Sequence, residues 1–147
     1  PGLISHKTEP GGGTTDYAVE IFYEAVKHKR YKCFLSKDTM LPMMFMPDAI
    51  DGTIKLMEAP ADGISTNCGY NITAISFTPE QLSNEIVRYV PEFEIEYEAD
   101  FRLEIAKTWP ATIDDSTARR DWGWKHKFNL SEMTEVMFRK ISEKFQV

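Results

Sequence analysis

Strand-like and helix-like segments alternate along almost the whole chain, and this alternation restricts the possible folds more than any other feature. Apolar residues at the 3.6-residue spacing predict helices, and short apolar, β-branched or aromatic runs predict strands. We expect helices over residues 17–27, 48–57, 78–89, 100–107, 114–121 and 130–141, and strands over 31–35, 41–46, 70–75 and 93–97. Such alternation is typical of α/β proteins.

A chain of 147 residues with 42% hydrophobic residues is large enough for one globular unit with a core. The run 41–46 is apolar on successive residues, so it predicts a strand buried on both faces, with its methionines as core filler. We find no internal repeat, and the number of elements does not suggest two complete domains.

Two helix starts carry strong local signals. Thr78 stands at an N-cap position, with Pro79 at the first helical position and Gln81 at the third, which together form a capping box. Asn129 followed by Glu132 predicts a similar start for the last helix.

Charge and cysteine content argue against several classes of function. The formal net charge of −6 disfavours a nucleic-acid partner, and the basic run 28–32 fits the end of a helix better. Cys33 and Cys68 lie outside any metal-ligand spacing, which predicts no metal site, no disulfide framework and a reducing compartment. No apolar run approaches the roughly 20 residues that a membrane span requires.

The segment 10–16, Pro-Gly-Gly-Gly-Thr-Thr-Asp, predicts a turn that leads directly into a helix. Three glycines allow positive φ angles and close approach of another group, and Thr14 or Thr15 could cap the helix. Backbone amides beyond the cap would favour a carboxylate or phosphate. The alternative is an ordinary loop before an ordinary capped helix.

Several common catalytic motifs are missing. We find no G-x-S-x-G elbow, no G-x-G-x-x-G fingerprint and no P-loop. Asp114 and Asp115 fit a helix cap better than an acid/base pair. Trp109 precedes Pro110 in an expected loop, where its indole could line a pocket or fill a core. The segment Trp122-Gly123-Trp124 is expected to pack a helix end against the body, with an indole N–H bonded to a carbonyl.

A set of short segments resembles the C-terminal half of the short-chain-type L-threonine 3-dehydrogenases, members of the extended short-chain dehydrogenase/reductase superfamily. The resemblance covers nearly the whole chain and rests on Pro1-Gly2, the segment 10–18, Leu41-Pro42-Met43-Met44 with Pro47-Asp48-Ala49, Ser76-Phe77-Thr78-Pro79, Trp109-Pro110, and Asp121-Trp122-Gly123-Trp124. It implies a largely truncated Rossmann-like fold, in which residues 1–147 are the substrate-binding portion with the last strands and helices of the NAD-binding domain.

The resemblance implies NAD-dependent oxidation of the β-hydroxyl of L-threonine to 2-amino-3-oxobutanoate. In the family, the tyrosine that takes the hydroxyl proton belongs to a Tyr-x-x-x-Lys motif before the Pro-Gly at which this chain starts. Tyr23 and Lys27 have that spacing but follow the glycine-rich segment, so we interpret them as a coincidence. We therefore expect no catalytic residue here, and a processed or truncated chain that is inactive alone.

The resemblance also implies a substrate site. Gly13, Thr14 and Thr15 would bind the amino-acid head group of L-threonine, and Trp109 would close the pocket.

For the cofactor, the family position after the Pro-Gly pair implies that Pro1 and Leu3 contact the nicotinamide end of NAD. The cofactor-binding N-terminal half would be absent. Family members further imply a homodimer when full length and a mitochondrial location.

Two alternatives remain. A nucleotide-sugar epimerase or dehydratase of the same superfamily would want arginines in its sugar-diphosphate pocket, and the stretch 11–57 contains only Arg30. A non-enzymatic truncated relative would explain the missing fingerprint and the missing Tyr-x-x-x-Lys.

Overall fold

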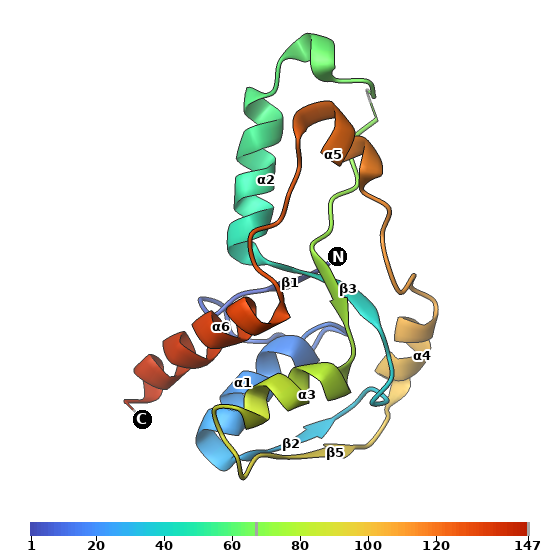
Figure 1. Cartoon of the computed structure of the whole chain (residues 1–147). Helices are drawn as coiled ribbons and strands as arrows, with labels where there is room; N and C mark the ends of the chain where they lie inside the picture. The colour runs from blue at the N-terminus through green and yellow to red at the C-terminus, as the bar shows by residue number, and fades with distance from the viewer. Residues whose placement is uncertain (67, 147) are drawn as a thin grey trace.

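A computed structural model describes residues 1–66 and 68–146. Its elements in chain order are β1 (Gly2–Ile4), α1 (Tyr17–His28), β2 (Arg30–Cys33), β3 (Leu41–Phe45), α2 (Met46–Glu58), a 3-10 turn (Ala61–Gly63), β4 (Ile75–Phe77), α3 (Pro79–Val87), β5 (Glu94–Tyr97), α4 (Phe101–Lys107), α5 (Ser116–Trp122) and α6 (Leu130–Phe145) (Figure 1). The α/β class predicted from the sequence is confirmed.

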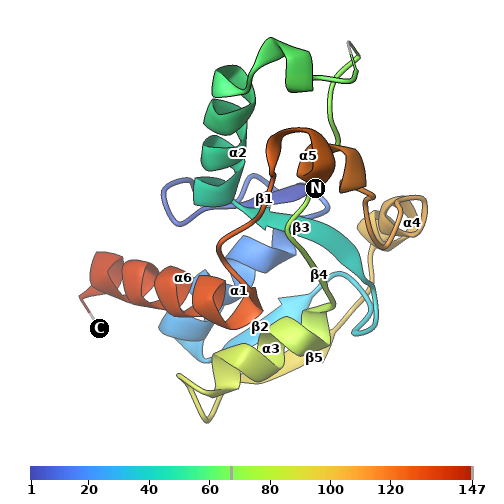
Figure 2. The ribbon, with the colours of Figure 1, turned by 45° about the horizontal axis from the view of Figure 1, so that its top comes forward.

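Two small sheets form the strand framework. In the first, β3 lies between β1, to which it is parallel, and β4, to which it is antiparallel. In the second, β2 pairs with β5 in parallel. Figure 2 shows α1, α3 and α6 gathered near β2 and β5, while α2 and α5 form a separate group that we call the α2 lobe. The predicted strands 41–46 and 93–97 are therefore confirmed as pairing segments.

The main core surrounds α1. Tyr17, Ile21 and Phe22 on this helix are fully buried, as the helical spacing predicts. From α6, Met133 and Met137 reach the same core. All residues of β3 are buried, which confirms a strand covered on both faces.

Two helices begin with the capping boxes that the sequence predicts. Thr78 accepts a hydrogen bond from the Gln81 amide at 3.2 Å, and the Gln81 side chain accepts from the Thr78 amide at 2.9 Å. Asn129 and Glu132 form the same reciprocal pair, with both distances at 2.9 Å. Both predicted capping boxes are confirmed.

The predicted strand 70–75 is wrong. The strand β4 begins only at Ile75, and residues 70–74 run without regular structure. Tyr70 and Ile72 instead pack on the small cluster around Trp124. Their aromatic and β-branched side chains serve this tertiary contact, not strand pairing. The sequence analysis also missed β1, whose three residues are too few to show an alternating pattern.

Trp124 anchors the α2 lobe. Its side chain is 2% exposed, and its Nε1 donates to the Thr73 carbonyl at 3.0 Å and to an Asp115 carboxylate oxygen at 2.9 Å. The predicted carbonyl partner is thus confirmed for Trp124, whereas the buried Nε1 of Trp122 has no hydrogen-bond partner among the described residues. Gly52 of α2 faces the indole so closely that a Cβ there would lie 2.7 Å from Cζ3.

Gly52→Ala should therefore destabilise the protein, although alanine favours helices by about 1 kcal/mol over glycine. Overpacking against the fixed indole typically costs about 1–3 kcal/mol. Thermal unfolding measures the effect, with Thr53→Ala at an exposed position of the same helix as the control. A melting temperature for Gly52→Ala at or above that of Thr53→Ala would contradict this packing.

Candidate functional site

A cavity of about 550 Å³ lies between β1, the start of α1, the start of β3 and the loop that follows α4. Its lining consists of Pro1, Gly2, Leu3, Thr15, Asp16, Pro42, Trp109, Pro110 and Ile113. We call it the Trp109 cavity. Most of this wall is apolar, and Asp16 is its one acidic side chain. A small ligand with few polar groups fits such a lining.

Four residues predicted for substrate or cofactor line this cavity together. Pro1 directly precedes β1 and Leu3 lies in it, Thr15 comes from the turn before α1, and Trp109 from a segment more than ninety positions later. Gly13 and Thr14 belong to the turn that precedes Thr15 but are not part of the lining.

Close packing fixes the wall between β1 and α1. A Cβ on Gly2 would lie 2.6 Å from the Met43 Sδ and 2.6 Å from the Thr15 Cγ2. Only glycine allows this approach, because real Cβ atoms do not come so near other heavy atoms. Thr15 is therefore held at the cavity by the strand beside it.

Asp16, and not Thr14 or Thr15, is the N-cap residue of α1, so the predicted threonine cap is wrong. One carboxylate oxygen of Asp16 accepts from the Gly11 amide at 2.7 Å and from the Gly13 amide at 2.9 Å. The glycine turn thus folds back on the acid. The amides that the sequence predicts to be free lie beyond the cap, and there Ala18 and Val19 donate to the carbonyls of Thr15 and Asp16 at 3.2 and 2.9 Å. A second carboxylate at this helix start would be repelled by Asp16.

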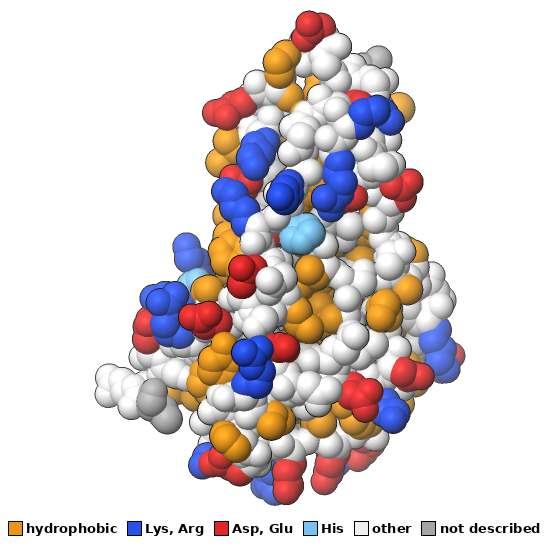
Figure 3. All heavy atoms as spheres, viewed as in Figure 1, with side chains coloured by type: hydrophobic (Ala, Val, Ile, Leu, Met, Phe, Trp, Pro, Cys, Tyr) orange, Lys and Arg blue, Asp and Glu red, His pale blue; other side chains and the backbone are white. Residues whose placement is uncertain are grey.

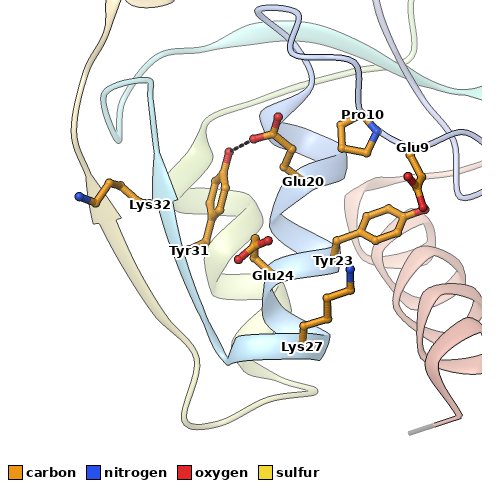
Figure 4. Close-up of a pocket in the computed structure, with 8 residues that line it drawn as sticks. All are labelled: Glu9, Pro10, Glu20, Tyr23, Glu24, Lys27, Tyr31 and Lys32. Carbon is orange, nitrogen blue, oxygen red and sulfur yellow. Dashed lines mark hydrogen bonds between the residues drawn. The ribbon is translucent and has the colours of Figure 1, made fainter.

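A second cavity, of about 360 Å³, lies on the other side of the glycine turn between α1 and β2 (Figure 4). Tyr31 crosses it and donates to Glu20 at 2.9 Å. Burial raises the pKa of Tyr31 strongly, with the nearby Glu20 as a further cause, so this phenol stays protonated.

Tyr23 and Lys27, which have the spacing of a catalytic pair, also line this second cavity. The Tyr23 hydroxyl accepts from Lys144 at 2.9 Å, and the Lys27 Nζ lies 4.4 Å from the centroid of the Phe145 ring. Neither lines the Trp109 cavity. Both side chains have structural partners in α6.

Basic side chains gather on one side of the α2 lobe (Figure 3). Asp51 pairs with two of them, Lys55 at 2.8 Å and Lys127 at 2.9 Å. Behind them, the buried Asp48 accepts from the backbone amides of Lys127 at 2.8 Å and Phe128 at 3.2 Å. These contacts hold α2 against the segment before α6, which is a structural role.

Within the described residues, no group of three or more His, Cys, Asp or Glu side chains could hold a metal ion. None of the helices in that part of the chain is long and apolar enough to cross a membrane. Cys33 and Cys68 are both free thiols.

No protein-family model matches the chain. The chain is 54% identical over 147 residues to an uncharacterized epimerase/dehydratase of Staphylococcus haemolyticus, covering 99% of this chain and 46% of that protein. It is 53% identical over 138 residues to the mitochondrial L-threonine 3-dehydrogenase of Bos taurus, covering 93% of this chain and 37% of the bovine protein.

Among solved structures, the L-threonine dehydrogenase from Phytophthora infestans is 55% identical and superimposes with a TM-score of 0.95. The match covers 98% of this chain and 47% of the Phytophthora chain. The chain thus spans less than half the length of these relatives.

The fold is α/β, and the chain is similar in sequence and structure to part of the longer threonine dehydrogenases of the extended short-chain dehydrogenase class. More narrowly, the chain is homologous to L-threonine 3-dehydrogenases and to epimerase/dehydratase proteins. The resemblance found in the sequence is confirmed, and the partial coverage agrees with a C-terminal half.

Trp109 and Trp124 should respond differently to truncation. Trp109 is 43% exposed at the cavity, whereas Trp124 is 2% exposed and hydrogen-bonded. Trp124→Ala should cost about 3–5 kcal/mol in the free energy of unfolding, and Trp109→Ala about 1 kcal/mol. Denaturant unfolding measures both, and equal losses would mean that Trp109 fills a core.

Proposed function

We propose that the protein oxidises L-threonine to 2-amino-3-oxobutanoate with NAD, a step of threonine catabolism towards glycine, and that this chain supplies the substrate side of the site. The observation that carries the proposal is the meeting of Pro1, Leu3, Thr15 and Trp109 in one cavity. Support comes from the names of the bovine and Phytophthora relatives.

On the substrate side, the Thr15 hydroxyl would hydrogen-bond the amino-acid head group, with Gly13 and Thr14 completing the turn beside it. Trp109 would cover the substrate and exclude water, as its half-exposed indole at the cavity allows. Asp16 lines the same wall, so the head group would approach it with its ammonium end, because a carboxylate there meets a like charge.

The residues of β1 fit one end of a dinucleotide. Pro1 and Leu3 line the cavity, and β1 is an edge strand that leaves peptide groups without a strand partner in its sheet. Such groups can hydrogen-bond a planar amide like that of nicotinamide. When bound, NAD would accept the hydride from the carbon that carries the threonine hydroxyl. Residues 1–147 contain no G-x-G-x-x-G turn for the pyrophosphate.

We also propose that residues 1–147 join a cofactor-binding half of the kind that the longer relatives contain. Parallel sheets are normally extended and covered on both faces, yet β1 is an edge with Leu3 49% exposed. On α2, Ile50, Ile54 and Met57 form an exposed apolar row at helical spacing. This edge and this row would meet the other half, which would supply the Tyr-x-x-x-Lys base.

An epimerase or dehydratase acting on a nucleotide sugar is the second candidate, and the name of the staphylococcal relative supports it. Against it, no arginine lines the Trp109 cavity, and Arg30 lines a different one. A diphosphate is normally bound by bidentate hydrogen bonds from arginine guanidinium groups. Assaying threonine and nucleotide sugars side by side separates the two, and a non-enzymatic relative would turn over neither.

A homodimer and a mitochondrial location are further proposals for the full-length protein. The mitochondrial bovine relative supports the location, whereas the staphylococcal relative is equally similar and bacterial. Analytical ultracentrifugation tests the dimer, and cell fractionation tests the location.

Thr15→Ala in the full-length protein should raise the Michaelis constant for L-threonine and leave that for NAD nearly unchanged. Losing a hydrogen bond to a charged group costs roughly 1.5–3 kcal/mol, or about 10- to 150-fold. Steady-state kinetics with Thr14→Ala alongside and Thr53→Ala as the remote control measure the effect. Unaltered threonine kinetics in both Thr14→Ala and Thr15→Ala would assign the turn a purely structural role.

The 147-residue chain alone should neither bind NAD measurably nor oxidise threonine. A missing positioned base typically lowers rates by about 10²- to 10⁴-fold, and a missing pyrophosphate turn removes the oxidant as well. Calorimetric titration with NAD and an NADH-formation assay test this. Saturable NAD binding with threonine turnover by this chain alone would contradict the expectation and make Tyr23 and Lys27 candidates for the catalytic pair.

A further inference from the structure

Arg102 connects α4 to the glycine turn, two segments that lie next to lining residues of the Trp109 cavity but do not line it themselves. Its Nη1 donates to the carbonyl of Gly12 in the glycine turn at 3.3 Å. Its Nε and Nη2 donate to the Asp100 carboxylate at 3.0 and 2.7 Å. The guanidinium carbon also lies 3.2 Å from the centroid of the Phe34 ring. One side chain thus links the start of α4 to a turn ninety residues earlier.

Asp100 and Phe34 fix the position of the guanidinium. The Asp100 amide donates to the Phe34 carbonyl at 3.2 Å, and the Asp100 side chain caps α4 by accepting from the Arg102 amide at 2.8 Å. A two-point contact with a carboxylate and stacking on a ring leave a planar guanidinium little freedom. The Arg102 side chain is 19% exposed, whereas the Asp100 side chain is 35% exposed and Gly12 is exposed, so the geometry of these contacts, and not their burial, fixes the guanidinium.

The glycine turn is held from its opposite side by Asp16. The amides of Gly11 and Gly13 donate to that acid, while the carbonyl of Gly12 between them accepts from Arg102. The turn therefore has contacts on both its donor side and its acceptor side. A shift of α4 would therefore displace the glycine turn and, through its bonds to Asp16, the start of α1.

Trp109 follows the end of α4 directly. Its amide donates to the Ala106 carbonyl at 3.1 Å, and the Thr108 amide donates to the Ile105 carbonyl at 3.0 Å. Trp109 therefore moves with the last turn of this helix, and Thr15 with the first turn of α1.

We propose that Arg102 is a positioning residue that sets the separation of Trp109 from Thr15 across the cavity. It acts through α4 and the glycine turn, and it touches no ligand. Lysine cannot replace it. A single ammonium group cannot pair with the Asp100 carboxylate at two points, stack on the Phe34 ring and donate to the Gly12 carbonyl at the same time. The kinetic consequence rests on the proposed function, whereas the structural consequence does not.

The test compares Arg102→Lys and Arg102→Ala with Arg88→Ala, which removes the exposed C-cap arginine of α3 together with its contacts to Glu85 and Ser131. In the full-length protein, we expect both Arg102 variants to raise the Michaelis constant for L-threonine roughly tenfold, with kcat and the constant for NAD nearly unchanged. Acrylamide quenching of Trp109, isolated as the difference from a Trp109→Phe background, should increase in both variants and stay unchanged in Arg88→Ala.

Unchanged quenching of Trp109 in a folded Arg102→Lys variant would overturn the proposal, and so would full recovery of threonine kinetics by lysine. If Arg102→Ala fails to fold, as its melting temperature would reveal, Arg102→Lys alone decides. Altered quenching in a protein that does not oxidise threonine would support the role of Arg102 and remove the proposed function. If the full-length protein oxidises threonine but the Arg102 variants show unaltered quenching and kinetics, the role of Arg102 is overturned and the proposed function stands.

Discussion

The bond between Asp16 and its own preceding turn determines where α1 begins, and most of the structure is arranged around α1. Gly11 and Gly13 donate to one oxygen of this acid, which closes the turn and starts the helix at Tyr17. From that start, buried residues of α1 meet β2, α3 and α6 in the main core. The same turn places Thr15 against Gly2 of β1, so the core and the cavity share one boundary.

Most helices could be predicted from the sequence because their signals are local. A capping box such as that of Thr78 needs only residues three positions apart, and apolar spacing identifies the face of α6 that carries Met133 and Met137. The irregular course of residues 70–74 could not be predicted, because Tyr70 and Ile72 pack on Trp124, a partner about fifty positions away. Composition alone does not distinguish a paired strand from an irregular segment that fills a cluster.

The cap of α1 shows the same limit within a short segment. Thr14, Thr15 and Asp16 are all good N-cap residues, and the sequence cannot say which one the glycine turn will face. The deciding event is the fold of the turn itself, in which Gly12 adopts a φ of +91°.

The candidate site was predictable mainly through family resemblance. Pro1, Leu3, Thr15 and Trp109 were named from matched segments, and the structure brings them to one cavity. Asp16 as a lining residue was missed, although an acid directly after three glycines and two threonines was a visible signal. Arg102 as a link to Gly12 had no signal in the sequence, since ninety residues separate donor and acceptor.

Buried or half-buried aspartates carry many of the long-range connections of this chain. The paired strands are short, so ladder hydrogen bonds join few distant segments. Asp48 accepts two backbone amides from the segment before α6, Asp115 accepts the Trp124 indole, and Asp121 accepts the Tyr70 hydroxyl at 2.7 Å. A carboxylate that accepts several N–H or O–H groups is stable in such a place only while all of them remain aligned. The arrangement therefore fixes irregular segments in single positions, which is what a cavity built largely from turns and loop residues requires.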